Sequence, residues 1–435
     1  MSLRRRIPRL FCVLVPAVAL VAGCGDADTP AQSAPPSSGP PSTVAVKTTD
    51  KSAPSTEATT TRPPDPPVHV PPTITTLAPG LVATTLVPAA AKVAPAPAQG
   101  VPVDIVFRDA ARGWMLSSGG NCVGCPVPLA ATTDGGASWS RVPSPNEGAA
   151  SSRFRLRASR QGELWLFDVP GSPLNASALW ESPDGGITWS RIAGLARISD
   201  LAVGPTTAWA VTDACDITAT SCVTAILRSN DHGATWHRVE TPLSLLQERY
   251  SAQLVVLDDE HVILLTQRAS PDAHDIVSTD DGGRHWATLT SVEECGVARS
   301  EIAAVDSRQL WLACAGGEGG GWERRVIARS DDGGHRWHVA LDALTFGYLE
   351  QVWANSPSKA YIGQCRGPAI VTTDGGVTWS AAADFRDPGD CMGPVVFTDA
   401  QHGYIGDFFN TDPDAKTKIW RTADAGRTWQ PVDVN

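Results

Sequence analysis

Seven aspartates recur in nearly the same octapeptide, which first occurs as T-T-D-G-G-A-S-W with Asp134 and Trp139. Carboxylates in such an array can transfer protons, bind a metal ion or fold back on the backbone. Each has a Ser or Thr two residues before it and a Gly two residues after it. Such side chains bond within tight turns, and Gly supplies a positive φ there. We therefore assign a structural role in turns to Asp134, Asp184, Asp231, Asp281, Asp332, Asp374 and Asp424.

Each octapeptide marks one repeated unit of the chain. Each ends in a Trp, and successive Trp residues are 50, 47, 50, 51, 42 and 50 residues apart. A second motif, F-x-D-x-x-x-G-W/Y, occurs at Phe107–Trp114 and again at Phe397–Tyr404. Together the motifs divide each unit into four short strands, which is typical of a propeller blade. The predicted units are 101–145, 153–196, 197–243, 251–292, 299–344, 348–385 and 393–435.

The sequence thus predicts an all-β fold, a seven-bladed β-propeller with Asp-turn hairpins. A solenoid is the alternative, but seven such units suit ring closure better. The last unit looks complete, so an exchange of strands between the ends is not obvious, and Leu81–Val87 is a candidate outer strand. His285 and Arg336 replace the usual Ser or Thr before the Trp, which predicts slightly weaker turns.

Eight cysteines lie in the repeat region, and an even number in an exported domain favours disulfides. They fall between the second and third strands of a unit or between units, on the face opposite the Asp turns. Pairing between sequence neighbours predicts the disulfides Cys122–Cys125, Cys215–Cys222, Cys295–Cys314 and Cys365–Cys391. The C-V-G-C segment lacks the second motif or the His cluster of a metal site. We therefore expect neither a metal nor a cofactor.

The N-terminal region has the features of an export signal and a stalk. Residues 1–23 combine four Arg with the apolar stretch Leu10–Val21 and end in L-V-A-G before Cys24. This ending resembles a bacterial lipobox, which implies that Cys24 is lipidated and anchors the protein to the outer face of the cell membrane. Residues 24–100 are rich in Pro, Ser, Thr and Ala, which predicts a disordered stalk before a propeller at 101–435.

Charge excludes one class of partner. Without the signal the chain has 31 basic and 46 acidic residues, a net charge of −15 with His neutral. Nucleic-acid binding needs a basic surface, so we expect no nucleic acid as partner. We expect a monomer.

The octapeptide is similar to the Asp box, or BNR repeat, of sialidases, sortilin-type receptors, some plant-polysaccharide hydrolases and photosystem II stability/assembly factor-like proteins. Residues 101–435 most resemble the last of these, through the seven units, the F-x-D-x-x-x-G-W/Y segment and the T-x-D-G-G-x-T-W box. That resemblance implies a non-enzymatic scaffold for membrane-protein assembly. The stalk and the disulfides depart from that family's usual plan.

A sialidase-like glycoside hydrolase is the enzymatic alternative. Such an enzyme needs Arg residues on the substrate carboxylate, a Tyr nucleophile activated by Glu, and an Asp acid/base. The Arg-Ile-Pro motif of sialidases occurs only at Arg6–Pro8, within the signal. Tyr361 and Tyr404 look like strand residues, which leaves Tyr250 and Tyr348. These features favour a protein without catalytic activity.

The favoured function is a surface-tethered, non-catalytic propeller that binds or scaffolds a cell-envelope protein or glycan. A membrane-complex assembly factor and a glycoside hydrolase remain alternatives. Aromatic side chains beside charges are typical of binding sites. The candidate contact residues on the cysteine-bearing face are Trp322, Arg324, Arg325, Phe408 and Phe409.

Overall fold

The structure is a computed structural model in which the chain divides into Met1–Thr73 and Ile74–Asn435. The residues that it describes all lie in the second unit. They are 81–83, 85–89, 91–92, 102–117, 128–145, 154–169, 176–215, 222–242, 249–269, 272–295, 299–317, 319–367, 369–382, 392–407 and 418–433. None of their helices has the length and apolar character needed to cross a membrane.

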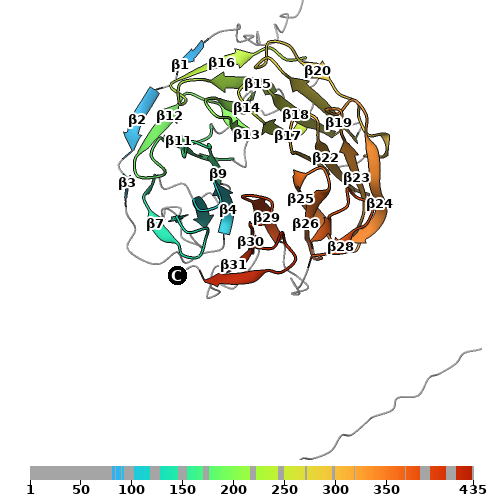
Figure 1. The fold of residues 1–435 in the computed structure, drawn as a ribbon. Coiled ribbons are helices and arrows are strands. Elements are labelled where there is room, and N and C mark those ends of the chain that lie inside the picture. The colour runs from blue at the N-terminus through green and yellow to red at the C-terminus, as the bar shows by residue number, and fades with distance from the viewer. Residues whose placement is uncertain are drawn as a thin grey trace, which may run out of the picture. The chain divides into compact units, whose positions relative to one another are not determined.

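Seven antiparallel sheets follow one another around a ring, which confirms the predicted seven-bladed β-propeller (Figure 1). Each blade takes four strands in chain order, with the first at the centre of the ring and the fourth at its rim. Blades one to three contain β4 (Pro102–Phe107), β5 (Gly113–Ser117), β6 (Leu129–Thr132), β7 (Ser140–Val142); β9 (Phe154–Ala158), β10 (Leu164–Asp168), β11 (Leu179–Ser182), β12 (Trp189–Ala193); and β13 (Arg197–Val203), β14 (Ala208–Cys215), β15 (Cys222–Ser229), β16 (Thr235–Val239).

The remaining four blades repeat this order. They contain β17 (Arg249–Val256), β18 (Val262–Ala269), β19 (Asp272–Thr279), β20 (Ala287–Thr288); β21 (Arg299–Ala304), β22 (Leu310–Gly316), β23 (Trp322–Ser330), β24 (His338–Phe346); β25 (Tyr348–Ser356), β26 (Lys359–Cys365), β27 (Ile370–Thr372), β28 (Ser380–Ala381); and β29 (Met392–Phe397), β30 (Gly403–Asp407), β31 (Lys418–Thr422), β32 (Gln430–Asp433). Blade five stands out because its two outer strands each have nine residues.

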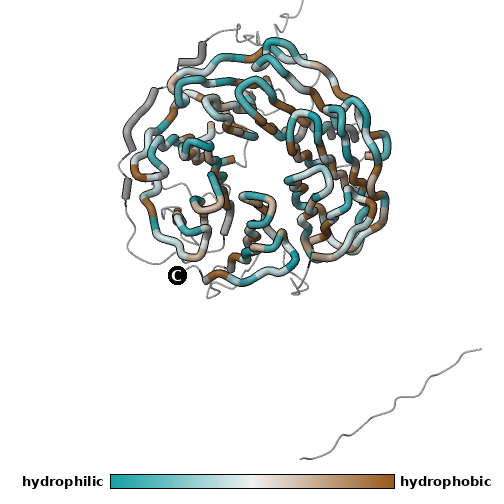
Figure 2. Tube along the Cα trace, viewed as in Figure 1, coloured by the Kyte–Doolittle hydropathy of each residue, from teal (hydrophilic) through white to brown (hydrophobic). Residues whose placement is uncertain are grey.

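The hydrophobic core is divided among the junctions between blades. Seven clusters of buried side chains each combine residues from two neighbouring blades. Hydrophobic positions accordingly recur in every blade (Figure 2). At three junctions a second-strand Trp meets, edge to face, the Trp at or just before the fourth strand of the next blade, with ring centroids 6.1–6.4 Å apart. These pairs are Trp165–Trp236, Trp209–Trp286 and Trp311–Trp379. The shared packing explains why Trp is so abundant in this sequence.

The seven aspartates hold the turns between third and fourth strands. In blade one, Asp134 accepts bonds from the Ser138 backbone N–H at 2.9 Å and from the Thr132 hydroxyl at 2.8 Å. The Ser138 hydroxyl donates to the other carboxylate oxygen. The hydroxyl and backbone bonds from Ser138 lower the pKa of Asp134 to about 2. His285 and Arg336 take over the role of that hydroxyl, because each side chain bonds to the aspartate of its own turn.

Side chains on the innermost strands tie neighbouring blades together at the centre. A carboxylate or amide oxygen from one strand accepts a bond from a backbone N–H of the next innermost strand. The bonded pairs are Asp104–Leu156 (3.0 Å), Asp200–Leu254 (2.7 Å), Gln253–Ile302 (2.9 Å) and Gln351–Val395 (3.1 Å). These bonds satisfy backbone groups that no strand within the same blade can reach.

In the described part of the chain before residue 101, three short strands lie within the range predicted to be stalk. β1 (Leu81–Ala83) pairs with β16 and β2 (Thr85–Ala89) pairs with β12, each as a fifth, outermost strand. β3 (Ala91–Lys92) pairs with β8 (Ser144–Pro145), which follows blade one. The candidate outer strand at Leu81–Val87 therefore serves two blades. An exposed strand edge offers unpaired backbone groups, and an extended segment can satisfy them whatever its composition.

The ring closes by packing blade seven against blade one. The four strands of each of these blades come from consecutive parts of the chain, so neither blade is completed by a strand from the opposite end. The closing cluster includes Met115 and Trp139 from blade one and Tyr404 and Ile419 from blade seven. Tyr404 also stacks on Phe107 at 4.1 Å between ring centroids.

Candidate functional site

A solvent-exposed apolar patch lies at the end of the long outer hairpin of blade five. Trp322 begins β23 and is 46% exposed, and Phe346 ends β24 and is 45% exposed. Leu344, two residues before Phe346, is 54% exposed. We call Trp322, Arg324, Leu344 and Phe346 the blade-five patch. Contiguous exposed apolar side chains of this size are characteristic of binding surfaces.

The strand register explains why these four side chains share one face. Trp322 is paired with Phe346, and Arg324 is paired with Leu344. Residues directly opposite in an antiparallel pair point to the same side, as do residues two apart on one strand. The Trp322 and Phe346 rings meet edge to face with centroids 5.6 Å apart. Arg324 makes two bonds to Asp342, at 2.8 and 2.9 Å.

The pairing of Arg324 with Asp342 defines the polar edge of the patch. Hydrogen bonding to Asp342 raises the pKa of the Arg324 guanidinium, and the same bonds lower the pKa of the Asp342 carboxyl. Both groups are therefore charged over the physiological range. Because the pair is bidentate, the guanidinium plane has a fixed orientation beside the two aromatic rings.

Arg325, the neighbour of Arg324, points the other way and is fully buried. It pairs with Glu323 at 2.7 Å and bonds to Gln364 in blade six. Glu323 also accepts a bond from the backbone N–H of Leu349. Arg325 therefore joins blade five to blade six and does not reach solvent. The alternation of side chains along a strand is the signal that separates the two arginines.

A disulfide holds the loop beside the patch. Cys295 and Cys314 are bonded, with Cα atoms 5.5 Å apart, and both are buried in the core cluster of blades four and five. Cys295 ends the short 3₁₀ helix η2 (Glu293–Cys295), whose exposed Glu294 acts electrostatically on Arg324. The bond thus fixes a second charged group at the edge of the patch. Such a constraint limits the conformations that the loop can sample.

The structure describes only some of the other predicted site residues. Cys215 and Cys365 are disulfide-bonded, and Cys215 is in register with Cys222 across β14 and β15. Cys24, Cys122, Cys125 and Cys391 lie outside the described residues, as do Phe408 and Phe409. The structure therefore brings Trp322 and Arg324 together and adds Leu344 and Phe346, which the sequence did not single out. The sequence pattern that could have indicated Leu344 and Phe346 is D-A-L-T-F at the end of β24, in which Asp342, Leu344 and Phe346 alternate and so lie on one face.

The outer edge of β24 is the second feature of this site. In blades two and three, the corresponding edges of β12 and β16 are covered by β2 and β1. Among the described residues no strand pairs with the outer edge of β24, although it is the longest rim strand. An edge of nine residues beside an apolar patch offers backbone hydrogen bonds and side-chain contacts to the same occupant.

The comparisons with known proteins concern the fold. No protein-family model matches the chain, and no curated protein matches it. Similar solved structures include YCF48 bound to a D1 peptide (TM-score 0.48, 18% identity, covering 82% of this chain and 100% of that one) and YCF48 from Cyanidioschyzon merolae (0.49, 19%, 77% and 97%). Another is the propeller domain of the trilobed protease from Pyrococcus furiosus, described as having an open velcro topology (0.51, 10%, 78% and 98%). The likeness to this last structure supports the β-propeller fold.

Proposed function

We propose that this protein is a non-catalytic binding propeller, tethered outside the cell membrane, that captures an extended segment of an envelope protein on blade five. The segment pairs with the outer edge of β24 and covers the blade-five patch. One observation carries the proposal: this chain already adds extended strands to the rims of blades two and three, while the longest rim strand keeps its edge open within the described part.

The chemistry of the patch favours a polypeptide over a glycan. Trp322, Leu344 and Phe346 offer apolar and aromatic area, and Arg324 adds a fixed charge. A strand laid along β24 gains backbone hydrogen bonds from the edge and apolar contacts from alternate side chains. Aromatic and Arg side chains contribute most of the free energy at protein interfaces. The corresponding requirement on the partner is an extended segment with apolar side chains at alternate positions.

The binding test uses a photoreactive amino acid at position 344 in the full-length chain. We expect cross-links to a protein segment, and none from the same group at Val377, which is 82% exposed in the Asp turn of blade six. Peptides identified by mass spectrometry are then synthesised, and N-methylation of alternate amides should abolish their binding. Cross-links to a glycan, or peptides indifferent to N-methylation, would contradict the proposed strand pairing.

The tether has a separate test. A lipid on Cys24 would hold the propeller at the membrane through buried acyl carbons, each worth about 0.8 kcal/mol. A Cys24→Ala variant should be exported and recovered in the soluble fraction, whereas the parent chain stays with the membrane. Complete retention of the variant at the membrane after signal cleavage would overturn the lipid anchor and leave the binding proposal standing.

A further inference from the structure

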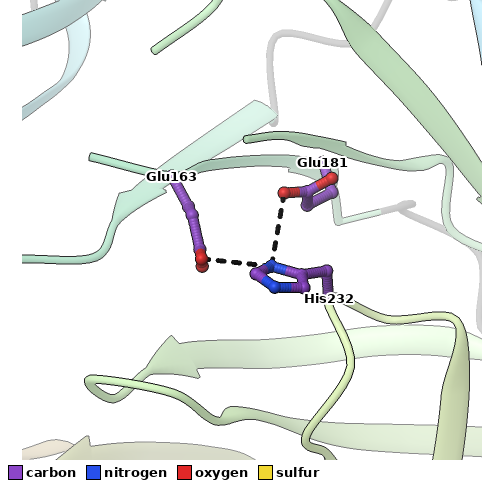
Figure 3. Close-up of side chains that lie close together, drawn as sticks. All are labelled: Glu163, Glu181 and His232. Atoms are coloured by element: carbon purple, nitrogen blue, oxygen red, sulfur yellow. Dashed lines mark ion pairs between the residues drawn. The ribbon is translucent and has the colours of Figure 1, made fainter. Parts of the chain in front are cut away.

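Two carboxylates and an imidazole meet on the Asp-turn side of the propeller, between blades two and three (Figure 3). Glu163 lies in the turn between β9 and β10, Glu181 lies on β11, and His232 lies in the Asp turn of blade three. The His232 Nδ1 atom is 3.1 Å from a Glu163 oxygen and 3.8 Å from the Glu181 Oε1 atom. The three potential ligand atoms all lie within 4.8 Å of one another.

The seven junctions of the ring share this geometry but not this chemistry. Glu181 on the third strand of blade two is paired with Trp165 on the second strand. In every other blade, the equivalent position is the third-strand residue paired with the residue that corresponds to Trp165, such as Trp114 in blade one. Those residues are Ala131, Glu181, Arg228, Ser278, Arg329, Val371 and Arg421. The position of Glu163, two residues before Trp165 or its counterpart, holds Arg112, Glu163, Thr207, His261, Gln309, Lys359 or His402. The second blade alone carries an acid at both of these described positions.

At two other junctions these positions supply donors to the Asp turn of the next blade. Arg228 donates to the carbonyl of Gly282 at 2.9 Å, and Lys359 donates to the carbonyl of Ala425. A carboxylate cannot donate in this way unless it is protonated. The junction of blades two and three instead has two acceptors at these positions, and His232 faces them from the turn.

Glu181 is left with an unsatisfied oxygen. Its side chain is only 6% exposed, and its Oε1 atom has no hydrogen-bond partner among the described residues. A buried carboxylate oxygen without a partner is unfavourable, and a second carboxylate nearby makes the charge harder to accommodate. A cation between Glu163 and Glu181 would remove both sources of instability.

His232 occupies a backbone position that disfavours a side chain. Its φ is 57°, in the left-handed region, and five of the other six turns have Gly at this position. The remaining turn has Ala425, with φ 67°. The strained position places the imidazole against Glu163, with the side chain 59% exposed to solvent.

We propose that Glu163, Glu181 and His232 bind one divalent transition-metal ion, for which Zn²⁺ is the best match. Zn²⁺ bonds to carboxylate oxygens and imidazole nitrogens at about 2.0–2.2 Å, so its ligand atoms lie a little over 3 Å apart. Three protein ligands leave one position of a tetrahedral ion for water, and the exposed side of His232 admits it. Ca²⁺ fits poorly because it requires six to eight oxygen ligands.

The test measures Zn²⁺ binding to the metal-free, full-length chain by titration calorimetry, with Co²⁺ absorption to report the ligand geometry. We expect one equivalent to bind and a four- or five-coordinate Co²⁺ spectrum. Glu181→Gln and His232→Gly should each weaken binding at least tenfold, because each removes one of three ligands. His232→Gly restores the residue that five sister turns carry, so its loss of binding cannot be ascribed to misfolding.

Two controls complete the design. His402→Ala removes a histidine that lies 2.8 Å from Asp399 on the same side of the propeller but, within the described residues, has no second carboxylate beside it. This variant should bind as the parent does. Ala425→Gly makes the same backbone change as His232→Gly in blade seven and should also leave binding intact. Equal Zn²⁺ affinity in the parent and His232→Gly chains, or no binding by the parent, would overturn the site. Neither result bears on the binding of a segment at blade five.

Discussion

At the scale of single residues, Arg324 and Arg325 show how a strand assigns opposite roles to identical neighbours. Arg324 forms an exposed pair with Asp342, whereas Arg325 is buried against Glu323 and Gln364. An exposed ion pair contributes little to stability. Removing one partner of a buried pair leaves an uncompensated charge away from water. The same residue type is therefore exposed at the surface in one position and buried between two blades in the next.

Alanine at these two positions should separate the roles. Arg325→Ala should lower the free energy of unfolding by about 3–5 kcal/mol, because Glu323 would remain buried without its partner. Arg324→Ala should change it by about 1 kcal/mol or less. Denaturant unfolding followed by Trp fluorescence measures both. Comparable losses for the two variants would show that the hairpin does not divide the arginines in this way.

Glu301 on β21 gives a residue-scale prediction about pH. Burial raises the pKa of Glu301 to about 7; Arg299 opposes this, and Asp200 and Glu350 reinforce it. The folded protein therefore keeps the proton of Glu301 at pH values where the unfolded chain has released it. This contribution to stability falls as pH rises from about 4.5 to about 7.

A Glu301→Gln variant should lose that dependence on pH. Relative to the parent, its free energy of unfolding should rise between pH 5 and pH 8 by on the order of 1–3 kcal/mol. Glu260→Gln, in an exposed turn of blade four, is the matched control and should follow the parent. A parallel course for the parent and Glu301→Gln across this range would contradict the assignment.

At the scale of elements, each Asp turn is held together by hydrogen bonds to the carboxylate of the aspartate at one fixed position. In blade five, Asp332 accepts bonds from the Arg336 backbone N–H at 2.8 Å and the Arg336 side chain at 2.9 Å. The hydrogen bond from the Arg336 side chain is the main cause of the lowered pKa of Asp332. Asp331, one residue earlier, is exposed. Because only Asp332 of these two adjacent acids accepts the bonds from Arg336, substituting each in turn tests whether the turn needs a carboxylate at that position.

Asp332→Ala should lower the midpoint of thermal unfolding by a few degrees at neutral pH, and Asp331→Ala should leave it unchanged. Because the pKa of Asp332 is lowered on folding, its contribution is complete above the unfolded value of 3.8 and disappears as pH falls through the folded value. The difference between parent and Asp332→Ala should shrink accordingly in acid. Calorimetry at neutral and acidic pH checks both statements.

The sequence predicted the features that depend on nearby residues. The Asp turns, the strands around them and the seven units follow from octapeptides in which the side-chain bonds of the Asp and of the Ser or Thr before it join residues at most four positions apart. The sequence could not predict the pairing of β1 with blade three and of β2 with blade two, because the paired residues lie 100 or more positions apart. The Glu163–Glu181–His232 cluster escaped for the same reason: it exists only where two blades meet.

At the scale of the whole molecule, one junction of the ring differs from the other six. Six junctions join blades that are consecutive in the chain, whereas blade seven meets blade one through side chains. The Tyr404 hydroxyl donates to the carbonyl of Gly135 there, as the Tyr361 hydroxyl does to the carbonyl of Ala425 between blades six and seven. The two tyrosines thus make equivalent contacts at a closing and a continuous junction.

Replacing each tyrosine by alanine should therefore have different consequences. Both substitutions remove a buried ring and leave a cavity between two blades. After Tyr361→Ala, the chain still connects blades six and seven. Tyr404→Ala removes both the hydrogen bond and the stacking on Phe107 at the only junction without that connection. Hydrogen–deuterium exchange should then increase in β4 and β30 together, while blade four is unaffected. If Tyr361→Ala speeds exchange equally at its own junction, chain continuity is not what protects the other six, and the ring opens at any seam with comparable ease.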